Sequence, residues 1–192
     1  MTELNAQTSA EKHASGANDT SRLYRALGET FAKVLLDRLS EQIICIVLYG
    51  SVARGRARPE SDIDLFVVAG ETDQESSDVQ NRIGKLDLDF WDGSESSELR
   101  ARGYRANIET LVVSKARALR GLPIYLDMTL DAIVLHDPAK FFVQRIELAR
   151  RQMAELRSYR EWIGPEEYFW HLKADAKPGE VFELPYIERT QK

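Results

Sequence analysis

Cysteine, long apolar runs and a secretory signal are scarce or absent in this chain of 192 residues, and each scarcity excludes a class of protein. Cys45 is the only cysteine, so no intramolecular disulfide can form, and a reducing compartment is expected. No apolar run reaches the roughly 18–20 residues that a membrane-spanning helix needs. The N-terminus also lacks the charged-then-apolar layout of a secretory signal. We therefore expect a cytoplasmic protein with no membrane partner.

Positive charge is in deficit. The chain has 26 Lys and Arg residues against 31 Asp and Glu residues, a formal net charge of −5. Proteins that hold long nucleic acids usually carry excess positive charge, so long DNA or RNA is disfavoured as a partner. The three histidines, His13, His136 and His171, have no metal-ligand spacing. A Gly-x-x-x-x-Gly-Lys loop is also missing, which excludes a P-loop nucleotidase.

Strand-like and helix-like segments alternate along the chain, which predicts an α/β (α+β) fold with a mixed β-sheet flanked by helices. Residues 1–19 contain few large apolar side chains, and we expect them to form a disordered N-terminal tail. Residues 20–137 form the expected main domain. Residues 138–192 are predicted to add a long C-terminal helix and an extended aromatic tail, both packed on the core.

The expected elements follow from apolar periodicity and from turn residues. Helices are expected over residues 20–39, 51–58, 72–83, 123–130 and 137–162, and also through Leu99 to Arg102. Strands are expected over residues 42–49, 62–68, 106–113 and 132–136. Residues 86–91 alternate like a further strand.

A Gly-Ser turn follows the first apolar strand. Gly50 has no Cβ, so a phosphate group can approach the backbone closely there. Ser51 adds a hydroxyl donor, and the short helix that follows offers backbone amides at its N-terminus. Taken alone, a Gly-Ser pair after a strand is usually only a turn.

Two aspartates follow in the next strand. Asp62 and Asp64 alternate with apolar residues, so on a strand both carboxylates point to the same face. Adjacent carboxylates repel each other unless a cation lies between them. Such a pair suits Mg²⁺, which takes one or two carboxylates together with substrate phosphates and water. A phosphate-holding turn beside this pair indicates phosphoryl or nucleotidyl transfer.

The combined motif resembles the signature of the DNA polymerase beta-like nucleotidyltransferase superfamily, in particular its small prokaryotic (minimal) branch. The residues that carry the resemblance are Gly50-Ser51-x-Ala53-Arg54-Gly55, followed after five residues by Ser61-Asp62-Ile63-Asp64-Leu65. The resemblance implies a nucleotidyltransferase domain over residues 20–137 that binds a nucleoside triphosphate and two Mg²⁺ ions. It further implies that Asp62 and Asp64 bind metal and that Gly50 and Ser51 hold the triphosphate. Arg54 would contact phosphate or brace the loop.

The superfamily also uses a third carboxylate on a neighbouring strand. Glu109 lies in the apolar segment 107–113, where an inward-facing acid would need a metal ion or another partner. Asp89, with Asp87 on the same face of the alternating segment, is the alternative, although a solvated strand face explains that pair better. We favour Glu109, which gives Asp62, Asp64 and Glu109 as the predicted catalytic and metal-binding set.

These features lead us to expect a Mg²⁺-dependent transfer of a nucleoside monophosphate, AMP from ATP, to a hydroxyl group. Three acceptors are open. One is a protein tyrosine, as in two-component systems where a small nucleotidyltransferase antitoxin modifies a HEPN-domain toxin. The others are a small molecule such as an aminoglycoside and an RNA 3′ end, which the acidic charge disfavours. The alternative function is a nucleotidyltransferase-fold binding module without catalysis, acting as an antitoxin or nucleotide sensor.

Overall fold

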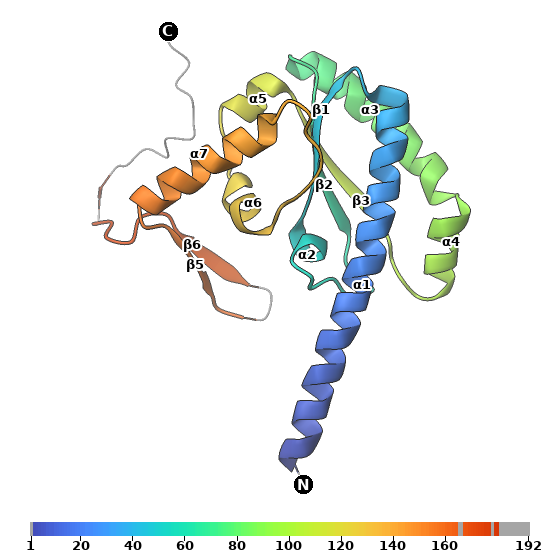
Figure 1. Cartoon of the computed structure of the whole chain (residues 1–192), viewed down its shortest axis with the longest axis vertical. Helices are drawn as coiled ribbons and strands as arrows, with labels where there is room; N and C mark the ends of the chain where they lie inside the picture. The colour runs from blue at the N-terminus through green and yellow to red at the C-terminus, as the bar shows by residue number, and fades with distance from the viewer. Residues whose placement is uncertain (1, 165–166, 178, 181–192) are drawn as a thin grey trace.

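A computed structural model describes residues 2–164, 167–177 and 179–180, and it shows a mixed four-stranded sheet between two layers of helices (Figure 1). The strand order is β3-β2-β1-β4. Strands β2 and β3 are parallel, whereas β1 runs antiparallel to both β2 and β4. This arrangement confirms the predicted α/β fold. The strands are β1 (Ile43–Tyr49), β2 (Ile63–Ala69), β3 (Ile108–Val113) and β4 (Ile133–His136).

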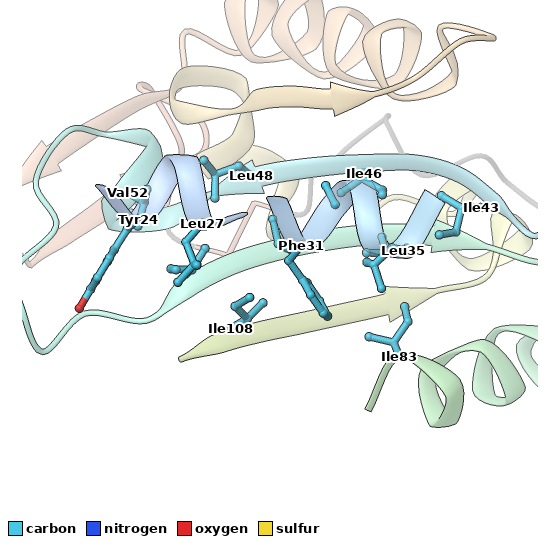
Figure 2. Packing of buried hydrophobic residues seen from close by; sticks show 14 of the residues in the cluster. Tyr24, Leu27, Phe31, Leu35, Ile43, Ile46, Leu48, Val52, Ile83 and Ile108 are labelled. Atoms are coloured by element: carbon cyan, nitrogen blue, oxygen red, sulfur yellow. The ribbon is translucent and has the colours of Figure 1, made fainter. Parts of the chain in front are cut away.

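Each face of the sheet has its own hydrophobic core, because alternate residues of a strand point to opposite faces. One face packs on α1 (Thr2–Leu39) and α3 (Asp73–Trp91), and Figure 2 shows Phe31 and Leu35 of α1 beside Ile46 of β1 and Ile83 of α3. The other face packs on helices α5, α6 and α7. Those helices span Lys115–Leu119, Tyr125–Asp131 and Phe141–Glu155.

Strands β1 and β2 are covered on both faces, which explains why both read as continuous apolar runs. Cys45 belongs to the second core and is fully buried, as expected for a small hydrophobic side chain. Burial raises the pKa of its thiol to about 12, which disfavours the thiolate form that a nucleophile needs. None of the described helices is both long and apolar enough to cross a membrane.

The N-terminal segment differs from its prediction. We expected residues 1–19 to be a disordered tail, but residues 2–19 continue helix α1, which Figure 1 shows extending away from the rest of the fold. The prediction weighed only the shortage of large apolar side chains. The segment also contains several good helix formers and no proline. Extending a helix that is already nucleated by the packed residues 20–39 costs less than starting a new one.

Helix α3 is longer than predicted. The segment 86–91, predicted as a strand, forms its last part, and helix α4 (Ser94–Ala101) follows. Val79, Ile83, Leu86 and Phe90 lie three or four residues apart, and all four pack in the core beside α1. The helical spacing of the larger apolar side chains therefore outweighed the short alternation of the aspartates.

Helix α7 is shorter than predicted, and a hairpin replaces its end. It stops at Glu155 rather than near residue 162, and Arg157 takes a left-handed conformation with φ 54°. Strands β5 (Tyr159–Trp162) and β6 (Tyr168–His171) then pair antiparallel. The predicted tail beyond residue 180 lies outside the described residues, and the domain boundary at residue 137 stays a prediction.

Tyr24 of α1 ties together the loops that precede β2 and β3. Its hydroxyl donates to the carbonyl of Pro59 (2.6 Å) and accepts from the backbone N–H of Ala106 (3.1 Å), and its side chain is fully buried. Tyr24→Phe leaves both backbone groups without this partner, so we expect it to lower the free energy of unfolding by about 1–3 kcal/mol. Urea denaturation measures the change. Tyr159→Phe, at an exposed tyrosine, is the control, and equal stability of the two variants would contradict the role of Tyr24.

Candidate active site

The sheet brings the Gly-Ser turn and the predicted carboxylates to one end of the fold. Tyr49 at the end of β1 pairs with Asp64 at the start of β2, and Asp64 pairs with Glu109 at the start of β3. Side chains in register on neighbouring strands lie on the same face. Tyr49, Asp64 and Glu109 therefore form a row across three adjacent strands. Asp62 stands just before β2, and its charge raises the pKa of Asp64, so it lies near this row.

Gly50 lies directly against the carboxylate of Asp64. Its backbone φ is +74°, which glycine adopts without steric cost. A Cβ added at this position would lie only 2.0 Å from Asp64 Oδ2. The turn and the first carboxylate of β2 are thus in contact, and only a residue without a side chain fits between them.

The turn continues into α2 (Gly50–Ala53), a single helical turn rather than the longer helix predicted to Arg58. Tyr49 stands at the N-cap position and makes no side-chain capping hydrogen bond. The first amides of α2 are therefore not capped by that side chain, and Ser51 is half-buried beside them. This geometry suits an anionic ligand at the turn.

Asp64 carries the strongest electrostatic signal of the site. Burial raises the pKa of its carboxyl group from 3.8 to about 6, and the charges of Asp62 and Glu109 add to the increase, whereas Arg54 opposes it. The same row of acids affects Tyr49, whose pKa rises to about 12 through burial and through the charges of Asp64 and Glu109. Clustered anions with raised pKa values are typical of sites that hold a cation.

Asp62 supplies a buried acceptor to the same site. Its Oδ1 atom has no hydrogen-bond partner, although Arg105 Nε lies 3.3 Å away as an ion-pair partner. The preceding residue, Ser61, orders the turn, because its hydroxyl accepts from the backbone N–H of Arg58 at 3.0 Å. The Arg105 cation therefore already lies beside Asp62 Oδ1, and a metal ion at this oxygen would compete with that ion pair.

The third-carboxylate candidates lie in different places. Glu109 is exposed in the row with Asp64, whereas Asp89 is exposed on helix α3. Asp87 is half-buried, and burial and the charge of Glu109 raise its pKa. The sequence analysis placed Asp87 on a solvated strand face. In the structure, the charge of Glu109 acts on Asp87, so Asp87 lies nearer the site than that prediction implied. The helical spacing of Leu86 and Phe90 was the signal that could have placed it on α3.

The donor set fits magnesium only in combination with a substrate. Among the residues that the structure describes, no three Asp, Glu, His or Cys side chains are gathered so that they could hold a metal ion by themselves. Mg²⁺ normally takes one or two carboxylates plus substrate phosphates and water. Asp62 and Asp64 match that smaller requirement, although Asp62 Oδ1 already forms an ion pair with Arg105.

Arg54 lies near the carboxylate of Asp64 and near that of Asp131 in the second half of the chain. Its Nη1 is 3.8 Å from Asp131 Oδ2 at the end of α6, and its charge lowers the pKa of Asp64. Nearby, the Arg56 guanidinium stacks 4.4 Å from the ring centroid of Trp162 in β5. The hairpin therefore borders the loop that carries the motif arginines. Sequence reasoning missed Asp131 and the hairpin, since neither belongs to the motif.

A glycine turn held against strand carboxylates, on a mixed sheet between helices, defines a site of the nucleotidyltransferase type. Residues 32–102 match the family model described as polymerase beta, nucleotidyltransferase. The match confirms the resemblance to the DNA polymerase beta-like superfamily over residues 32–102. The matched segment contains Gly50, Asp62 and Asp64, whereas Glu109 and the hairpin lie outside it.

A solved structure described as "Crystal structure of the toxin-antitoxin with AMP-PNP" has a TM-score of 0.39 to this chain and 19% sequence identity. The similarity covers 67% of this chain and 92% of that chain. A likeness at this level says nothing about function. No curated protein matches the chain.

Proposed function

We propose that this protein is a Mg²⁺-dependent nucleotidyltransferase that transfers a nucleoside monophosphate, AMP from ATP, to a hydroxyl group. One observation carries the proposal: the Gly50 backbone lies against Asp64, and Asp64 is in register with Glu109. A triphosphate held at the turn would thus have its reacting phosphate beside the carboxylates. The family match supports the reaction class, and the choice of ATP rests on the resemblance.

The proposed reaction is a displacement at the α-phosphorus. The acceptor oxygen forms a bond to that phosphorus while the bond to the pyrophosphate oxygen breaks, and pyrophosphate leaves. Magnesium bound with the substrate would lower the pKa of the acceptor hydroxyl and neutralise charge on the leaving group. Asp62 and Asp64 would hold the metal, and the exposed Glu109 would accept the acceptor's proton and pass it to solvent.

The triphosphate itself would be bound by the turn. Gly50 lets the phosphates approach the backbone, and the uncapped amides of α2 and the Ser51 hydroxyl would donate to them. Arg54 would add positive charge beside the same phosphates. These assignments keep the roles predicted from the motif, and the contact between Gly50 and Asp64 explains why turn and metal ligands act together.

For the acceptor we propose a hydroxyl on a partner protein, such as a tyrosine of a HEPN-domain toxin. Tyr159, Ile163 and Phe169 of the hairpin segment are large apolar side chains that remain exposed. Exposed apolar side chains in one short segment are typical of protein contact surfaces. A small-molecule acceptor and a noncatalytic binding module are the alternatives.

The test is incubation with labelled ATP, CTP, GTP and UTP, each with Mg²⁺ and with the product of the adjacent gene as acceptor. We expect label from one nucleotide, ATP, to appear on the acceptor, and to be lost when EDTA removes the metal. Binding of nucleotide and partner without any transfer of label would contradict the enzymatic proposal and favour the binding module.

The assignment of the third carboxylate makes a separate prediction. Glu109→Gln is expected to lower kcat by about 10²–10⁴-fold, the range of general acid–base catalysis. Asp89→Asn, on the exposed face of α3, is expected to leave kcat within about twofold. Steady-state kinetics of both variants decide the matter. Loss of activity in Asp89→Asn alone would show that the wrong carboxylate had been chosen.

A further inference from the structure

The C-terminal hairpin is fixed to helix α6 by two carboxylates of that helix. Trp170 Nε1 donates to Asp127 Oδ1 at 2.8 Å, and Arg160 Nη1 donates to Asp131 Oδ2 at 2.5 Å. Asp127 and Asp131 lie four residues apart, so they face the same side of the helix. The face of the hairpin that carries Arg160 and Trp170 is thereby held beside α6. The loop that follows α2 contacts the same hairpin through Arg56.

Arg160 is the most constrained residue of this contact. Its side chain is 11% exposed, and its guanidinium lies 4.8 Å from the Trp162 ring centroid, 4.9 Å from that of Tyr168 and 6.0 Å from that of Trp170. Stacking on several rings and an ion pair in a largely buried setting restrict the planar guanidinium to one position. Arg160 therefore offers Asp131 a preorganised partner.

Asp131 is shared between two arginines, and the sharing is unequal. Arg160 lies 2.5 Å from Asp131 Oδ2, whereas Arg54 of the triphosphate turn lies 3.8 Å from the same atom. The Arg54 side chain is 20% exposed and that of Asp131 15%. Arg160 thus holds the carboxylate at hydrogen-bonding distance, whereas Arg54 makes only a long contact with it.

We propose that Arg160 is a positioning residue for nucleotide binding: by holding Asp131, it prevents a close ion pair between Asp131 and Arg54 and leaves Arg54 directed at the triphosphate. This inference rests on the proposed function. It assigns the hairpin, which lies outside the matched family segment, a part in the nucleotide site.

The physical reason is competition for one carboxylate. Without Arg160, Asp131 would be a largely buried anion without its close partner, a costly state. Arg54 already contacts Asp131, so a small movement of its side chain would form the close pair and neutralise the cation that the phosphates need. The affinity for the triphosphate would then fall, while the carboxylates that carry the chemistry would stay in place.

The test compares Arg160→Gln with the double variant Arg160→Gln/Asp131→Asn. Binding of an ATP analogue with a methylene group between its α- and β-phosphorus atoms is measured by calorimetry with MgCl₂, and KM and kcat are measured by label transfer. We expect Arg160→Gln to raise Kd and KM about tenfold with kcat within threefold, the effect of losing one charged phosphate contact. The double variant should return both values to within about twofold of wild type. A merely structural role predicts the opposite, because two lost contacts would be worse than one.

Two further variants serve as controls. Arg160→Lys keeps the positive charge and should bind the analogue within threefold of wild type. Arg157→Gln removes an exposed ion pair with Asp175 (2.8 Å) in the same part of the chain and should leave Kd unchanged. If Arg160→Gln does not fold, as judged by circular dichroism, Asp131→Asn alone decides the matter. Asp131→Asn should bind the analogue at least as tightly as wild type.

The inference is overturned if Arg160→Gln leaves Kd unchanged, if the double variant binds more weakly than Arg160→Gln, or if Asp131→Asn weakens binding fivefold or more. If the wild-type protein transfers label, any of these three results overturns the inference but leaves the proposed function intact. A wild-type protein that binds no nucleoside triphosphate would overturn both the function and the inference.

Discussion

Asp64→Asn is expected to abolish nucleotidyl transfer and, in the absence of metal, to make the protein more stable at neutral pH. Removing a metal-binding carboxylate forfeits several kcal/mol of transition-state stabilisation, and about 4 kcal/mol corresponds to a loss of roughly 10³-fold in rate. Label transfer with saturating ATP and acceptor measures this loss. Activity of Asp64→Asn within tenfold of wild type would contradict the assignment of Asp64 as a metal ligand.

The gain in stability follows from the raised pKa of Asp64, which burial and the charge of Asp62 bring from 3.8 to about 6. Between these two values the native protein binds more protons than the unfolded chain, so stability falls as pH rises through this range. The penalty is absent below about pH 4 and complete above about pH 6. Two pKa units correspond to about 3 kcal/mol, and the partial exposure of the carboxylate reduces this to about 1–2 kcal/mol.

Asp64→Asn removes the buried charge and should therefore be more stable than wild type by about 1–2 kcal/mol at pH 7.5, with most of this difference gone at pH 4. Urea denaturation in EDTA at the two pH values measures this. Asp89→Asn, an exposed aspartate of α3, is the matched control and should change stability at neither pH. A less stable Asp64→Asn protein at pH 7.5 would show that burial of the charge is not costly here.

Gly50→Ala is expected to cause the second large loss. The new methyl group would lie 2.0 Å from Asp64 Oδ2 and 2.9 Å from its Cγ, and the backbone φ of +74° is unfavourable for alanine. The turn or the carboxylate must therefore move. Since about 1 Å of misplacement can cost 10²-fold in rate, we expect activity to fall by at least that factor. Backbone strain and overpacking should together lower the free energy of unfolding by about 2–4 kcal/mol.

Gly55→Ala is a closely matched control for this prediction. Gly55 belongs to the same motif and has a similar φ of +71°, but a Cβ there would meet nothing within 4 Å. Gly55→Ala should show the backbone cost alone, about 1 kcal/mol, with activity within a few-fold of wild type. Label transfer and urea denaturation of the two variants separate strain from contact with Asp64. Equal loss of activity in both would contradict the contact as the cause.

The local part of the site was predictable from the sequence because its geometry depends on residues close together in the chain. Gly50 follows a buried strand, Asp62 directly precedes the next strand and Asp64 lies at its start. Strand periodicity alone then puts both carboxylates on one face. The apolar segment around Glu109 likewise indicated a neighbouring strand, and the structure places Glu109 opposite Asp64.

Errors in the predicted elements arose where two local patterns competed. Residues 86–91 alternate like a strand, yet Leu86 and Phe90 continue the apolar stripe of α3, and packing against α1 favours the helix. Residues 2–19 contain few large apolar residues, yet their composition suits the extension of a helix. In both cases the structure depended on a neighbouring element: packing against α1 for residues 86–91, and the already formed helix for residues 2–19.

By itself, the sequence predicted the order of the central strands and helices along the chain and the proximity of a Gly-Ser turn to two aspartates, whereas the sheet order β3-β2-β1-β4 came from the structure. Only the tertiary structure decided that Gly50 touches Asp64, that Asp87 approaches Glu109, and that Arg54 and Arg160 share Asp131. The physical reason is distance along the chain. Periodicity reports the face on which a residue lies, whereas contacts between remote segments depend on how sheet, helix and hairpin pack together.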